Sequence, residues 1–231
     1  RWATAASLPP PPPPPPSSEI AAHTTRENAR VTTMASSADG WTTYRLLTVL
    51  PPGAASAYTL VGEIAMPELG EPEQLLIMPA AYQVASPFGV DIGGGNPAFF
   101  TMMPDVEFDS WVTVGPTDGS AVGAISSIGI DFGSWTADAG LSADNGAVFW
   151  MDPSSGPGGA GPICLAQITV LEGSTFTAEG KLQGKSSDSG ADDWTSSVRW
   201  ATAAPPPPPS SDIPAHTTSE NARVTTMASS A

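Results

Sequence analysis

The sequence predicts an all-β protein: a single β-sandwich domain, immunoglobulin-like or jelly-roll-like, carried between two polyproline connectors. Between residues 39 and 198, short runs of β-branched and aromatic residues alternate with Gly- and Pro-rich turns, at roughly ten-residue spacing. No amphipathic helical period persists beyond one turn in this range. Outside it, one block occurs twice: RWATAA opens residues 1–38 and 199–231, and the same twelve residues, ENARVTTMASSA, close both.

The first expected strand is WTTYRLLTVL, which ends at Pro51-Pro52-Gly53. Asp118-Gly119 and Asn145-Gly146 supply positive φ cheaply, so we expect a turn at the first pair and a hairpin at the second. Pro79 breaks a longer run into two strands. The expected strands are residues 41–50, 57–66, 73–86 (broken near Pro79), 99–103, 110–114, 125–132, 147–151, 163–171, 174–182 and 194–200.

The repeated block divides the chain into a connector (residues 1–38), a domain (39–198) and a second connector (199–231) that leads to a next unit. Pro9 to Pro16 are unbroken prolines, which exclude helix and sheet and form a polyproline II rod. At about 3.1 Å per residue the rod is about 25 Å long. Because Pro205 to Pro209 form a shorter rod between matching ends, the rod is interpreted as a spacer. We expect residue 232 to begin another Asp39-Gly40-Trp41.

Charge is unevenly distributed along the chain. The net charge is −15, and residues 39–198 hold 19 of the 23 carboxylates against three bases. Phosphate binding needs basic patches, so nucleic acid is not an expected partner. The connectors hold five of the eight arginines and lysines, which an acidic neighbouring domain would attract. The expected assembly contact is therefore the connector tail, at Arg26, Arg30, Val31, Met34, Arg223, Val224 and Met227.

Two interpretations of this tail stay open. Its β-branched residues permit an edge strand on the domain before or after it. A solvated linker is the alternative.

The domain lacks the residues of most catalytic sites. His23 and His216 are the histidines, and both lie in connectors, which argues against Ser-His-Asp and Cys-His catalysis and most zinc sites. The single cysteine, Cys164, lies in an apolar run and is expected to be buried. No apolar stretch is long enough to span a membrane. We therefore expect no enzyme activity.

The strongest enzymatic signal is the run DVEFDSW at residues 105–111. On a strand, Asp105, Glu107 and Asp109 would share one face beside Trp111, as in a β-sandwich glycosidase. A solvated acidic edge is the favoured interpretation. Asp91, Asp105, Glu107 and Asp109 are also the candidate ligands for Ca²⁺, the single cofactor considered.

The tryptophans offer a second alternative. Trp41, Trp111, Trp135, Trp150 and Trp194 are expected mainly in the core. A carbohydrate-binding or adhesin module would instead require an exposed aromatic cleft near Trp111 or Trp135.

Three features carry a family resemblance: proline rods flanked by Ser and Thr, the alternation of rod with a cysteine-poor acidic β-domain, and the run PFGVDIGGGNPAFF at residues 87–100. Together they resemble the repeated extracellular domains of algal hydroxyproline-rich glycoproteins. The resemblance implies prolyl hydroxylation and O-glycosylation at Pro9, Pro10, Pro11, Pro12, Pro13, Pro14, Pro15, Pro16, Ser17, Ser18, Pro205, Pro206, Pro207, Pro208, Pro209, Ser210 and Ser211.

The expected function is that of a structural repeat unit in a secreted, O-glycosylated extracellular filament, cell-wall or glycocalyx protein. Its expected partners are copies of itself, joined in a non-closing array through contacts between connector and neighbouring domain. The second hypothesis is a carbohydrate-binding or adhesin module on stiff stalks. The third is a β-sandwich glycosidase.

Overall fold

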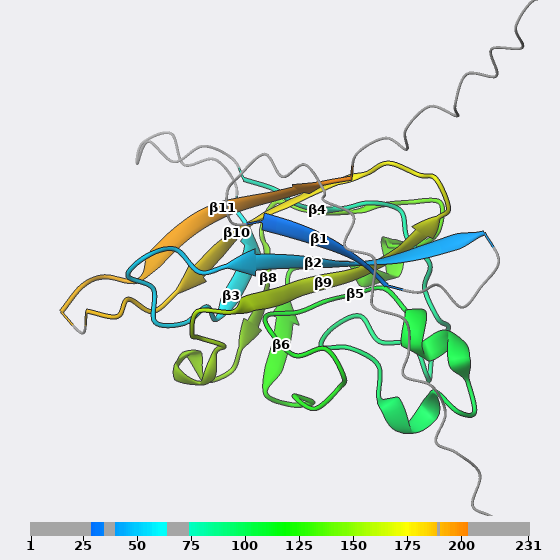
Figure 1. Ribbon diagram of the computed structural model, residues 1–231, viewed down its shortest axis with the longest axis horizontal. Helices are drawn as coiled ribbons and strands as arrows, with labels where there is room; N and C mark the ends of the chain where they lie inside the picture. The colour runs from blue at the N-terminus through cyan, green and yellow to red at the C-terminus, as the bar shows by residue number, and fades with distance from the viewer. Residues whose placement is uncertain (1–28, 35–39, 64–73, 189, 203–231) are drawn as a thin grey trace, which may run out of the picture.

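The computed structural model describes residues 29–34, 40–63, 74–188 and 190–202, which form two antiparallel sheets (Figure 1). This confirms the expected all-β, sandwich-like domain. The four-stranded sheet has the order β1 (Ala29–Met34), β2 (Trp41–Val49), β9 (Pro162–Leu171), β5 (Trp111–Val112). The seven-stranded sheet has the order β6 (Ile125–Ile128), β8 (Gly146–Trp150), β3 (Thr59–Gly62), β10 (Thr177–Gly184), β4 (Leu76–Met78), β7 (Leu141–Ala143), with β11 (Trp194–Ala201) paired to β10.

The larger sheet is built around β10. One edge of β10 pairs with β11 from Thr177 to Gly184. The other edge is shared, because β3 lies opposite residues 181–183 and β4 lies opposite Glu179. In turn β8 pairs with β3, and β7 pairs with β4. Thus β3 and β4 lie one after the other along the same edge of β10 and together form one row of the sheet. Strands β8 and β7 form the next row in the same way.

The core lies between the two sheets. Leu46 of β2, Leu165 of β9, Leu60 of β3, Leu182 of β10 and Trp200 of β11 are almost fully buried there. Strand β9 is buried from residue 163 to residue 170. Its side chains join those of the larger sheet in the core, and Gln167 contacts the segment around residues 105–111. Each fully buried aliphatic side chain of this kind contributes about 1.5–3 kcal/mol.

Most strongly β-forming runs are strands as expected, with β2, β9 and β11 within a residue or so of their expected ends. The expected strand at 99–103 is wrong. The short 3-10 helix η2 (Pro97–Phe99) ends at the first residue of this range, and a turn follows at residues 100–102. Pro97 suits a first helical position, and the Asn96 side chain accepts from the Ala98 N–H. The other 3-10 helices are η3 (Pro104–Phe108), η4 (Phe132–Ser134) and η5 (Pro153–Ser155).

The expected hairpin at Asn145-Gly146 is also wrong. Strand β7 ends at Ala143 and β8 begins at Gly146, but the two strands lie in one row and do not pair with each other. Gly146 pairs with Gly62, and a Cβ on Gly146 would lie 2.8 Å from the Gly129 carbonyl oxygen. The glycine is therefore needed for close backbone approach and not for a turn.

Both ends of the domain reach into the ranges assigned to the connectors. Strand β1 lies within residues 1–38, and β11 continues through Ala201. The proline rods, with Ser17, Ser18, Ser210 and Ser211, lie outside the described residues. Among the residues that are described, no helix has the length and apolar character to cross a membrane.

Candidate assembly site

The connector tail forms an edge strand. Strand β1 pairs antiparallel with β2 in a register that runs from Ala29 opposite Thr48 to Met34 opposite Thr43. Arg30 and Val31, two of the expected assembly residues, lie opposite Leu47 and Leu46. Of the two interpretations of the tail, the edge strand is therefore correct for residues 29–34, and the strand belongs to the domain that follows it. Arg26, Arg223, Val224 and Met227 lie outside the described residues.

Both connectors meet the domain along the same edge of the sandwich. Strand β1 ends the order of the smaller sheet, while β11 lies at the edge of the larger sheet. The two strands contact each other and run side by side in Figure 1. One connector therefore enters, and the other leaves, at neighbouring edge strands.

Strand β2 is held in place independently of β1. It pairs with β9 along its whole length, from Trp41 opposite Leu171 to Val49 opposite Pro162. The Thr43 and Thr169 hydroxyls are hydrogen-bonded at 2.7 Å. The backbone edge that receives β1 is consequently a preformed edge of a well-packed sheet.

The carboxylate motif at residues 105–109 does not form the expected strand face. Pro104 begins helix η3, and Asp105 and Glu107 are exposed, whereas Asp109 is fully buried just after the helix ends. The proposed pairing of Asp105 and Glu107 on one strand face beside Trp111 is thus wrong. The proline decides this, because it fixes a helical φ at the first position and cannot donate to a sheet ladder.

Asp109 braces the backbone around it. Its Oδ1 accepts from the N–H groups of Val84 at 2.8 Å and Ser110 at 3.0 Å, and its Oδ2 accepts from Val90 at 2.7 Å. Burial raises the pKa of Asp109 to about 6, although the three N–H groups act to lower it. Asp91 is close enough for its charge to add to this rise in pKa.

Gln167 continues the brace from strand β9. Its Nε2 donates to the carbonyl oxygens of Glu107 at 2.9 Å and Asp109 at 2.8 Å. Asp109 and Gln167 therefore fasten an irregular segment onto one face of β9. Within the described ranges, no three His, Cys, Asp or Glu side chains lie close enough to hold a metal.

The aromatic cleft expected for a carbohydrate-binding module is missing at both named positions. Trp111 is 1% exposed and Trp135 is 2% exposed. Trp135 donates from Nε1 to the Pro79 carbonyl oxygen at 2.7 Å, and Trp150 donates to that of Val114 at 2.8 Å. Trp111 and Trp135 are thus buried packing and Trp150 is partly buried, and the indole N–H groups of Trp135 and Trp150 are hydrogen-bonded.

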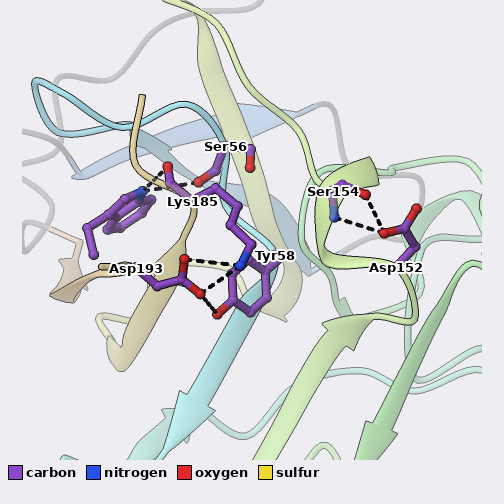
Figure 2. Close-up of polar contacts among 7 residues, drawn as sticks. Ser56, Tyr58, Asp152, Ser154, Lys185 and Asp193 are labelled. Carbon is purple, nitrogen blue, oxygen red and sulfur yellow. Dashed lines mark hydrogen bonds and ion pairs between the residues drawn. The ribbon is translucent and has the colours of Figure 1, made fainter. Parts of the chain in front are cut away.

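A polar cluster that the sequence did not indicate joins Tyr58, Lys185 and Asp193 (Figure 2). The Tyr58 hydroxyl donates to Asp193 at 2.7 Å, and Lys185 Nζ lies 3.0 Å from the same carboxylate. Burial and the neighbouring carboxylate raise the pKa of Tyr58 to about 12, so this hydroxyl keeps its proton at neutral pH. The cluster ties the segment before β3 to the β10–β11 hairpin. Residues more than 120 positions apart give no local signal for such a contact.

Two hollows lie on the surface of the described residues. One, of about 340 Å³, is lined mainly by apolar residues with Asp91 as its charged group. The other, of about 610 Å³, has Arg45, Asp118 and Trp150 in its lining. The second also contains Ser120, whose side chain is hydrogen-bonded to Asp118, and neither lining includes a histidine. The most developed feature for function is therefore the pairing of the connector tail with β2.

Comparison with family models, with curated proteins and with solved structures finds no match for this chain.

Proposed function

We propose that the chain is a structural repeat unit of a secreted, O-glycosylated extracellular filament, cell-wall or glycocalyx protein whose partners are copies of itself. The observation that carries the proposal is the double use of one sequence. Residues 29–34, ARVTTM, form an edge strand of the domain, and the same six residues recur at 222–227 beyond a second rod. The sequence that forms the first strand of this domain therefore occurs again after the second proline run.

The other end of the repeated block supports the same interpretation. Arg199-Trp200-Ala201 are the last residues of β11, and Trp200 is fully buried, donating from Nε1 to the Leu47 carbonyl oxygen at 2.8 Å. RWATAA thus begins inside the last strand of a domain, and ARVTTM is the first strand of one. The block as a whole is a joint: last strand, proline rod, first strand.

A joint of this kind sets distance and direction between folded units. Strand β11 leads into Pro205 within a few residues and without a Gly/Ser hinge. Polyproline II is stiff over several residues, so the number of prolines determines the spacing. The output of such an array is mechanical. No observation in the described residues favours the two alternatives, since Trp111 and Trp135 are buried and Asp105 and Glu107 lie on a helical turn.

The covalent part of the proposal is tested on the protein purified from the organism that makes it. Mass spectrometry of the two connector peptides should find hydroxyproline and attached sugars at the rod prolines and at Ser17, Ser18, Ser210 and Ser211. Residues 87–100, which contain prolines outside the rods, provide the internal control. Rod prolines that carry neither hydroxyl groups nor sugars would contradict a hydroxyproline-rich glycoprotein.

The spacing part is tested by electron microscopy of assembled filaments. Removing four prolines from each rod should shorten the axial repeat by about 12 Å, at 3.1 Å per residue. Replacing the same four prolines with Gly and Ser keeps the chain length but removes the stiffness, so the repeat should become variable. An unchanged repeat in both variants would show that the rods do not set the spacing.

A further inference from the structure

The second copy of the tail carries the same strand-forming residues as β1. Beyond the six residues of β1, identity extends over residues 27–38 and 220–231. In an antiparallel pair, backbone groups provide the ladder and alternating side chains provide the match to the neighbour. Segments of identical sequence therefore present identical ladders and identical side chains to the same acceptor edge.

The acceptor edge is β2. Strand β2 keeps its place through its pairing with β9, from Trp41 to Val49, and its far edge is available for one strand. In this chain β1 occupies that edge between Thr43 and Thr48. Any second ARVTTM segment that reaches a β2 edge without a β1 meets a template of the right register.

We propose that Ala222–Met227 is a donor strand that pairs with residues 43–48 of another copy of this domain. The register is that of β1, with Ala222 opposite Thr48 and Met227 opposite Thr43. The proposal rests on the proposed function, because it takes the units to form an array. The pairing is the contact by which successive units join. In an array, each domain receives at β2 the strand that follows the preceding rod, as β1 follows Pro9 to Pro16 here, and this head-to-tail relation propagates without closing.

Strand β1 competes with residues 222–227 for the β2 edge, so pairing between copies can be detected only when β1 no longer occupies that edge. Strand β1 is tethered to β2 through a short connection, which gives it an effective concentration in the mM range. An intact 231-residue chain consequently keeps its own β1 and is expected to be a monomer. Opening the β2 edge of the full chain exposes the donor activity of residues 222–227.

The edge is opened by the double substitution V31P/T32P. Successive residues of an edge strand point their N–H groups alternately toward and away from the partner, so two adjacent prolines remove at least one ladder bond and distort the strand. By light scattering after size-exclusion chromatography, V31P/T32P should form concentration-dependent oligomers. Adding V224P/T225P should return it to a monomer, whereas adding S229P/S230P, outside the donor strand, should leave it oligomeric. V224P/T225P alone should be monomeric.

A peptide assay keeps the proposal falsifiable if the opened chain folds poorly. A peptide of residues 220–231 is added to the chain carrying V31P/T32P and V224P/T225P. The peptide should restore strand content by circular dichroism and raise the Tm, and a peptide with V224P/T225P should do neither. A V31P/T32P chain that folds and stays monomeric, including one whose β2 edge is occupied by its own residues 222–227, would overturn the proposal. So would a native peptide without effect.

Failure here is distinguishable from failure of the proposed function. The strand exchange uses unmodified protein and does not depend on hydroxyproline or sugar. Glycosylated rods combined with no strand exchange would reject the donor strand alone. Strand exchange combined with unmodified rods in the native protein would reject the glycoprotein filament and leave the donor strand standing.

Discussion

Asp109 shows how a carboxylate in an acidic motif becomes a structural element. Its side chain is fully buried and each oxygen accepts backbone N–H groups from residues up to 25 positions away. A buried carboxyl group is costly unless it is hydrogen-bonded, and here three donors meet that need. Its exposed neighbours Asp105 and Glu107 have no such surroundings.

The first prediction concerns the removal of this brace. Asp109→Ala leaves the N–H groups of Val84, Val90 and Ser110 without their acceptor, so we expect it to lower the free energy of unfolding by about 3 kcal/mol. Asp105→Ala, at an exposed position, should change it by less than about 0.5 kcal/mol. Urea titration followed by circular dichroism provides the measurement. Equal effects of the two substitutions would contradict the structural role of Asp109.

The second prediction concerns pH. Because the pKa of Asp109 is raised from 3.8 to about 6 on folding, the folded chain holds a proton that the unfolded chain has released over about pH 4–6. Stability should therefore fall as pH rises through this window, by up to about 3 kcal/mol for a two-unit shift. The raised pKa of Asp91 acts in the same direction. Urea midpoints at pH 4.5 and 7 should differ less in Asp109→Asn than in the native chain, and an identical difference would count against this origin.

The third prediction concerns Cys164, which is 5% exposed and whose pKa burial raises to about 12. A buried thiol that stays protonated reacts slowly with disulfide reagents. Ellman's reagent should therefore modify one thiol per chain in guanidinium and almost none in the folded protein. Fast modification under native conditions would contradict the buried position of the strand β9 that carries it.

At the scale of the element, the larger sheet depends on places where two backbones come very close. Gly62 ends β3 at the point where β4 and β7 begin their own pairing. A Cβ on Gly62 would lie 2.0 Å from the Ala143 carbonyl oxygen and 2.6 Å from the Leu76 nitrogen. Both obstacles are backbone atoms of paired strands, which cannot move aside as a side-chain end would.

We therefore predict that Gly62→Ala destabilises the domain by about 3 kcal/mol or more, through overpacking at this junction. Gly161→Ala is the matched control, because a Cβ there meets no atom within 4 Å. The control should be neutral or slightly stabilising. The measurement is the Tm of both variants by thermal unfolding. A Gly62→Ala protein with the native Tm would show that the end of β3 and the β4–β7 pair are not in close contact.

At the scale of the whole molecule, charge opposes compactness. A net charge of −15 places many carboxylates on one small domain, and the ion pairs Lys181–Glu63, Lys185–Asp193 and Arg199–Glu179 each have partly exposed side chains. The more exposed pairs, Lys185–Asp193 and Arg199–Glu179, contribute little. Repulsion among the remaining carboxylates should then decrease when salt screens it.

The corresponding prediction is that Tm rises by about 2–4 °C between low salt and about 0.3 M NaCl, equivalent to about 1 kcal/mol. Differential scanning calorimetry at constant pH checks it. The same ionic strength made with CaCl₂ separates general screening from a specific site, since a clearly larger rise with CaCl₂ would indicate bound Ca²⁺. A Tm that falls with NaCl would show that attraction between charges dominates.

Part of the fold could be predicted from the sequence because the governing interactions are local. The run of apolar and β-branched residues at 163–171 predicts a strand, and the structure has β9 there. The β-branched tail ARVTTM permitted a strand in the same way. These features depend on what each residue does to its own backbone or to its near neighbours.

The rest was decided by contacts between residues far apart in the chain. No local signal distinguishes Asp109, which is buried, from Asp105, which is exposed, and Asn145-Gly146 has the composition of a hairpin although its flanking strands lie in one row. The sequence by itself determined the all-β class, the two proline runs and the repeated block. Only the tertiary structure decided that the tail joins β2 of the following domain, because a strand's partner is chosen by packing and backbone pairing across the whole sheet.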